Sequence, residues 1–85
     1  MKIKIRFVER CSQDGEVKDY LIQKKGLFGW EYIKWAEEMG YGSIVYFYCD
    51  NQKSGLLDLV LEKHFRTTKK FCSITEYPSL RIIEP

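Results

Sequence analysis

The sequence predicts a small α+β domain, an antiparallel sheet of about four to five strands with one helix packed on one face, in the order β-β-β-β-α-β. Tyr, Phe and Trp make up 15% of the 85 residues and Ala36 is the only alanine, a composition that favours strands over helices. Residues 2–11 alternate polar and apolar side chains with the two-residue period of a strand, whereas residues 54–66 have helical spacing. A run of strands followed by one helix indicates a single domain spanning residues 1–85.

The first two strands, residues 2–11 and 17–25, are predicted to form a hairpin, because Asp14-Gly15 between them is a strong turn signal. A two-residue turn there predicts four cross-strand pairs: Phe7 with Ile22, Glu9 with Tyr20, Arg10 with Asp19, and Lys4 with Lys25. The face expected to join the core carries Ile3, Ile5, Phe7, Tyr20 and Ile22. The other face is expected to be polar and uncovered, with a Val8/Leu21 pair in its centre.

The middle of the chain is predicted to hold two further strands. Gly26–Gly29 is expected to be a turn. Residues 29–35 are favoured as a strand because bulky aromatic residues are mediocre helix formers. A helix competes there, since Phe28, Tyr32, Trp35, Ala36 and Met39 lie at helical spacing. Residues 37–43 contain two glycines and are expected to be a loop, and residues 44–49 are predicted to be a strand.

One helix is predicted over residues 54–66. Its apolar stripe consists of Leu57, Val60, Leu61, His64 and Phe65, and Leu59 projects away from that stripe. Residues 71–77 alternate again and predict the last strand, which Pro78 is expected to end. Residues 80–83 form a short tail that can add an edge pairing.

Three cysteines, Cys11, Cys49 and Cys72, bear on the compartment. Because their number is odd and no CxxC or CxxH pair exists, we expect a reducing interior, no zinc site and no cofactor. Cys49 and Cys72 are expected to be small buried side chains; the alternative is a nucleophilic thiol paired with His64, the only histidine. No stretch resembles a signal peptide or stays apolar for the roughly 18 to 20 residues that span a membrane. We therefore expect a cytoplasmic protein without a membrane partner.

Enzymatic activity is not expected, because none of the common motifs that position a nucleophile, a phosphate or a metal is present. His64 lies near the predicted helix end, where the helix dipole would favour the imidazolium, so a structural role is expected. Glu37 and Glu38 are expected to be solvated, since adjacent carboxylates do not normally converge on one point.

The segment from Tyr20 to Trp30 contains Lys24-Lys25-Gly26-Leu27-Phe28-Gly29-Trp30. It resembles a pattern of small, uncharacterised phage-type and prophage-type bacterial proteins. The resemblance implies a hairpin, a Lys-rich aromatic turn, a further strand, a capped helix and a final strand, in a cytoplasmic and phage-derived setting. The helix start departs from this pattern, because Leu57 stands where an acidic capping residue is expected. Such families carry no assigned catalytic residues.

We expect the chain to be a non-catalytic protein-interaction module that binds a protein partner through the uncovered sheet face, or binds a second copy of itself through that face or an edge strand. Exposed aromatic side chains ringed by charge are typical of protein-protein anchors. The candidate surface consists of Lys4, Arg6, Val8, Arg10, Leu21, Lys25, Trp30 and Tyr32.

The alternative is single-stranded nucleic-acid binding on the same face. Trp30 or Tyr32 would stack a base, and the phosphates would be followed by Lys2, Lys4, Arg6, Arg10 and Lys25. Three observations weigh against it. The net charge is only +2, Asp19 is expected to neutralise Arg10, and acidic residues 31, 37 and 38 are close in sequence to the aromatic residues.

Overall fold

The computed structural model describes residues 1–85, and its α+β class is the one predicted. The elements in chain order are β1 (Lys2–Cys11), β2 (Val17–Gly26), β3 (Gly29–Tyr32), β4 (Lys34–Met39), β5 (Gly42–Phe47), β6 (Cys49–Asp50), α1 (Lys53–Lys63), a short 3₁₀ turn (Lys69–Phe71) and β7 (Ser73–Ile83). No helix combines the length and the apolar character that a membrane span requires.

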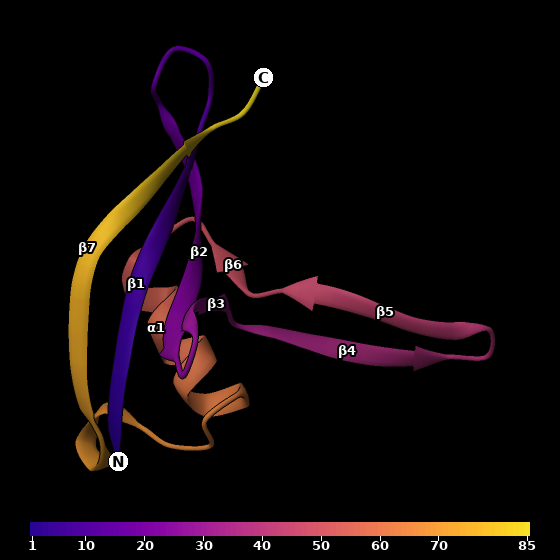
Figure 1. Cartoon of the computed structure of the whole chain (residues 1–85), viewed down its shortest axis with the longest axis vertical. Helices are drawn as coiled ribbons and strands as arrows, with labels where there is room; N and C mark the ends of the chain where they lie inside the picture. Colours follow the sequence, from indigo (N-terminus) through magenta and orange to yellow (C-terminus); the bar gives the residue numbers. More distant parts are fainter.

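The main sheet has the strand order β3-β2-β1-β7, with β6 also pairing with β2. Neighbouring strands are antiparallel except for β1 and β7, which run parallel. The sheet is therefore mostly antiparallel, as predicted, with one parallel pair that the sequence analysis did not predict. The cause of the parallel pair is the crossover through α1, which returns the chain to the far edge of β1 in the direction of β1 (Figure 1).

The β1–β2 hairpin has the predicted register over most of its length. Phe7 pairs with Ile22, Glu9 with Tyr20 and Arg10 with Asp19, and the outermost pair of the ladder is Ile5 with Lys24. The turn differs from the expectation, because Gly15 has a φ of +89° and the Ser12 N–H donates to the Glu16 carbonyl at 2.8 Å. The loop is thus one residue longer than predicted, and an irregularity between Arg10 and Cys11 restores the register.

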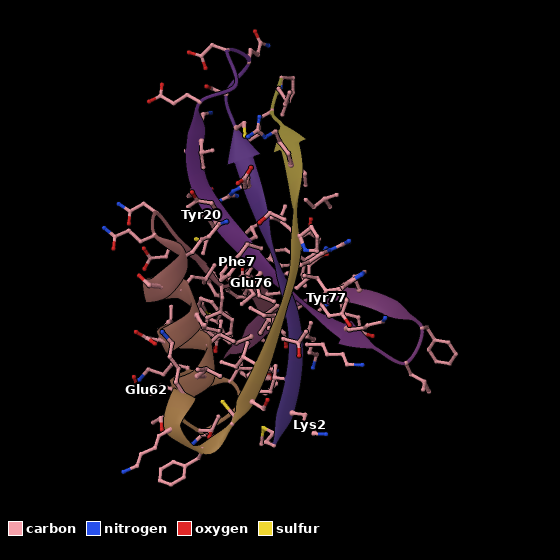
Figure 2. The ribbon with its side chains drawn as sticks, turned by 90° about the vertical axis from the view of Figure 1, so that its left-hand side faces the viewer. Lys2, Phe7, Tyr20, Glu62, Glu76 and Tyr77 are labelled. Atoms are coloured by element: carbon pink, nitrogen blue, oxygen red, sulfur yellow. The ribbon has the colours of Figure 1, made fainter.

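The core lies between α1 and one face of the sheet (Figure 2). Its buried members are Ile3, Ile5, Phe7, Ile22, Ile33, Tyr48, Leu56, Val60 and Leu61. The helix begins and ends earlier than predicted, and Leu56, which the predicted stripe left out, is completely buried. Leu59 was expected to project away from the core, but it is partly buried against it. Tyr48 is a member of the core cluster and widens the surface on which α1 packs.

Strands β4 and β5 leave the sheet as a two-stranded arm, which projects sideways in Figure 1. The arm comprises residues 34–47, including the turn at Gly40 and Tyr41. Residues 29–35 are extended as predicted, with a break at Ile33. The predicted loop at residues 37–43 was wrong, because Glu37 pairs with Ile44 and Glu38 with Ser43. The base is anchored where the Ile33 N–H donates to the Ile22 carbonyl at 3.0 Å.

The last strand continues past Pro78, which was expected to end it. Arg6 pairs with Tyr77 and Val8 with Leu80, so β7 has one extra residue at this point. Because β7 is an edge strand, the missing N–H of proline removes no obligatory sheet bond. The predicted edge pairing of residues 80–83 is present, with Ile83 beside Cys11.

Candidate binding surfaces

The sheet face opposite α1 carries the predicted candidate residues, but two of them are buried. Val8 is 0% exposed and Leu21 is 9% exposed, so neither offers contact surface to a partner. The expectation that this pair is uncovered was wrong. Val8 lies between Leu21 on β2 and Leu80 on β7, and the pairing of β7 with β1 supplies a neighbour on the side that the hairpin alone leaves open.

Arg10 is neutralised by its neighbours. It donates hydrogen bonds to both carboxylate oxygens of Asp19, with Nε 2.6 Å from Oδ1, and its Nε lies 4.0 Å from Glu84 Oε1. The hydrogen bonding of Arg10 to the Asp19 carboxylate is the main reason that the pKa of Arg10 is raised above its ordinary value. Arg10 is therefore a structural residue, as the predicted pairing with Asp19 implied.

The remaining polar part of this face forms what we call the cationic platform. Cross-strand register places its side chains on one face, because Arg6 is opposite both Gln23 and Tyr77, Gln23 is opposite Tyr32, and Lys25 is opposite Trp30. In Figure 2, Lys2 and Tyr77 lie on the side of the sheet away from α1. The platform consists of Lys2, Lys4, Arg6, Gln23, Lys25, Trp30, Tyr32 and Tyr77.

Cations and aromatic rings are interleaved on the platform. The Arg6 guanidinium lies over Trp30, 4.6 Å from the ring centroid, and the Lys25 ammonium is 5.5 Å from the Tyr77 centroid. The Trp30 and Tyr77 rings meet edge to face at 5.2 Å. Arg6 Nε also donates a 2.7 Å hydrogen bond to Gln23 Oε1. These contacts hold the Arg6 side chain in place.

Sequence reasoning missed Tyr77 as a member of this surface. Alternation within residues 71–77 marks Tyr77 as part of a strand, but only the parallel pairing with β1 brings it beside Arg6 and Trp30. No local signal predicts that pairing. The alternation of the hairpin does place Gln23 on the polar face. Its contact with Arg6 follows because the two residues are cross-strand partners in β1 and β2.

The arm is a second, apolar surface. Its exposed large side chains are Trp35, Met39, Tyr41, Val45 and Phe47. An aromatic row follows one side of the arm to the core: Trp35 stacks on Tyr46 at 5.0 Å and lies 4.7 Å from Tyr48, which is buried. The arm is thus attached to the core at its base and open to solvent along its length.

A cavity of about 500 Å³ lies in the angle between the base of the arm and α1. It is lined by Trp35, Phe47, Tyr48, Cys49, Leu59 and Lys63, all apolar except the lysine. Cys49 is exposed and Cys72 is half-buried, so the expectation that both are buried was wrong; Cys11 is the buried thiol. Cys49 is exposed because β6 is a two-residue edge strand beside this open cavity.

His64 packs among aromatic side chains. Its ring packs edge to face against Phe65 at 4.8 Å and Tyr48 at 6.3 Å, and it shares no hydrogen bond with a cysteine. Burial, and secondarily the charge of Lys24, lower the pKa of His64. The expected preference for the imidazolium at the helix end is therefore reversed. No three His, Cys, Asp or Glu side chains gather as metal ligands.

Comparison with known proteins identified no relative of this chain. No protein-family model matches the chain, and searches of curated proteins and of solved structures found no match. The phage-type origin suggested by residues 20–30 stays a prediction. The two surfaces, the cationic platform and the arm, are the features from which a function can be argued.

Proposed function

We propose that this chain is a non-catalytic protein-interaction module and that the arm joins two copies of it. The observation that carries the proposal is the exposure of Trp35, Val45 and Phe47 on two strands that each have one neighbour only. A two-stranded ribbon is marginally stable in water, and unpaired strand edges are templates for another strand. A partner strand would satisfy that edge and cover apolar surface.

The charges of β4 favour a second copy of the same strand as the partner. In an antiparallel β4–β4 pair centred on Ala36, Lys34 of each copy is opposite Glu38 of the other. Two symmetric opposite-charge pairs then flank a small central residue. Strand β5, residues 42–47, has no charged side chain and offers no comparable means of setting a register.

A cytoplasmic location is part of the proposal. An odd number of cysteines, with an exposed free thiol at Cys49, suits a reducing compartment.

Size-exclusion chromatography with light scattering tests the pairing across a range of protein concentrations. Wild-type protein should become dimeric as its concentration rises. Lys34→Glu and Glu38→Lys each place like charges opposite each other twice, and each should weaken the dimer about tenfold or more. The double variant Lys34→Glu/Glu38→Lys restores opposite charges and should recover the dimer.

Glu16→Lys is the matched control, because Glu16 is exposed at the tip of the β1–β2 hairpin and forms no ion pair. It changes the net charge as Glu38→Lys does and should leave the dimer intact. A wild-type chain that stays monomeric at every concentration contradicts self-association. A double variant no better than its parents contradicts the register.

A further inference from the structure

We infer that the cationic platform binds single-stranded nucleic acid, a role separate from the proposed pairing through the arm. Its four cations, Lys2, Lys4, Arg6 and Lys25, form no ion pair with any carboxylate of the chain. Among the strand residues that the register places on this face, Asp19 is the only acidic one, and it is occupied by Arg10. An uncompensated positive face fits a polyanion.

The acidic residues that weighed against this role lie elsewhere in the fold. Glu31 is opposite Lys24, on the other face of the sheet from Trp30 and its neighbours. Glu37 and Glu38 belong to the arm, which leads away from the sheet (Figure 1). A net charge of only +2 therefore conceals a separation of basic and acidic surfaces.

The Arg6 side chain is preorganised to bind a phosphate. Its Nε is held by Gln23, which is itself 6% exposed, and its guanidinium plane rests on Trp30. Neither terminal nitrogen has a hydrogen-bond partner within the chain, so both are free to donate to two oxygens of one phosphate. Fixing the side chain before binding lowers the entropy that a ligand must overcome.

The lysines extend this site along the strand. Lys2, Lys4 and Arg6 point to the same face at intervals of about 6.7 Å, twice the rise of a strand residue. Successive phosphates of an extended single strand are spaced by a similar distance. Lys25 lies on the neighbouring strand and widens the positive strip.

Planar groups next to this strip favour unstacked bases over a duplex. Phe28 is 96% exposed at the β2–β3 turn, and Figure 2 shows that turn on the side of the sheet away from α1. The exposed ring and the guanidinium plane of Arg6 are both surfaces on which a base can stack. This face of the sheet presents no helix that could enter the groove of a duplex.

Fluorescence anisotropy with a labelled single-stranded oligothymidine, titrated with the full chain at several salt concentrations, tests the inference. Arg6→Ala should weaken binding about tenfold or more. Lys4→Ala/Lys25→Ala should also reduce the slope of log K against log salt by about 1.4, because each lost phosphate contact contributes about 0.7. Phe28→Ala should weaken binding about fivefold or more without changing that slope, since stacking releases no counterions.

The chain contains a control of the same composition at the 3₁₀ turn, where Lys69, Lys70 and Phe71 reproduce two lysines and an exposed phenylalanine outside the platform. Unlike the platform lysines, Lys69 is ion-paired, with its Nζ 3.3 Å from Asp58 Oδ1 on α1. Lys69→Ala/Lys70→Ala and Phe71→Ala should bind as wild type does, with circular dichroism confirming the fold of every variant.

Three results would overturn the inference. One is no binding at low salt, where electrostatic attraction is strongest. Another is equal loss in the control variants, which would indicate unspecific charge attraction. The third is tighter binding of a duplex of the same length, or of phosphatidylserine vesicles, which would assign the platform to a different anionic surface.

Discussion

Arg10 and Asp19 face each other across β1 and β2, and the guanidinium donates to both carboxylate oxygens of Asp19. The pair is partly exposed, with a third of the Arg10 side chain and a quarter of the Asp19 side chain accessible to solvent. Paired geometry of this kind is at the upper end of what surface ion pairs contribute. It also removes one cation from the sheet face that otherwise carries only unpaired cations.

Replacing Asp19 with asparagine should therefore have two effects. The free energy of unfolding from urea melts should fall by about 0.5 to 1 kcal/mol. Affinity for single-stranded oligothymidine should rise. The substitution removes the only carboxylate among the strand residues of this face, and Arg10 keeps only the longer contact with Glu84, at 4.0 Å. Glu62→Gln is the control, since it removes a carboxylate from the exposed surface of α1. If Asp19→Asn left the affinity unchanged, Arg10 would lie outside the nucleic-acid path.

Leu61 anchors α1 to the sheet and should be among the most sensitive core positions. It is 1% exposed and belongs to the main apolar cluster with Phe7 and Ile22. Leu61→Ala should cost about 2 to 5 kcal/mol, which threatens a domain of this size. Leu80→Ala, at a side chain 39% exposed, should cost far less. A loss below about 1 kcal/mol for Leu61→Ala in urea melts would contradict this packing.

The hairpin could be predicted from sequence because its two constraints are local. Alternation fixed which side chains face the core, and the Asp-Gly signal located the turn. The turn was one residue longer than expected, yet Phe7 still faces Ile22 and Arg10 still faces Asp19. An irregularity next to Cys11 absorbs the extra loop residue, because any other register would turn the core residues to solvent.

The rest of the sheet could not be predicted, because its signals are not local. The parallel pairing of β7 with β1 depends on the path of the chain over α1, and it brings Tyr77 to the platform and covers Val8. The arm lacks a clear alternating pattern because neither of its faces packs on a core. Glu37 and Glu38 were therefore predicted to lie in a loop, although both belong to β4 and pair with residues of β5.

His64 should make the stability of the fold depend on pH in the weakly acidic range. Its folded-state pKa lies below the ordinary value of 6.5, because burial and Lys24 disfavour the charged ring. As the pH falls below 6.5, the unfolded chain gains a proton that the folded chain does not, so the free energy of unfolding decreases. Above pH 6.5 the stability contribution is fully present.

Urea melts between pH 5 and pH 8 should show this loss, and His64→Gln should flatten it within about that range. Carboxylates with lowered pKa values, such as Asp14 at the hairpin turn, act at more acidic pH and should be unaffected by the substitution. An unchanged pH profile in His64→Gln would show that another group is responsible.

The three thiols should differ in their reaction with Ellman's reagent under native conditions. Cys49 is exposed, Cys72 is half-buried and Cys11 is buried. One fast-reacting thiol per chain is expected, and Cys49→Ser should abolish that phase. Cys11 should react only after unfolding in urea. A fast phase that survives Cys49→Ser would contradict the placement of β6 at the open edge of the sheet.

Hydrogen exchange should separate the arm from the core and report on pairing at the same time. In dilute protein the amides of β4 and β5 should exchange about tenfold or more faster than those of β1 and β2, because a solvent-exposed ribbon opens without unfolding the core.

As the protein concentration rises, protection should increase at alternate amides of β4, whose outward N–H groups pair with the second copy. The amides of β5 that face β4 should be slowed as well, whereas core amides such as that of Ile22 should not change. Lys34→Glu should remove the concentration dependence and leave the slow core unchanged. Protection that grows on β7 instead would place the contact between copies at the edge of the main sheet and not on the arm.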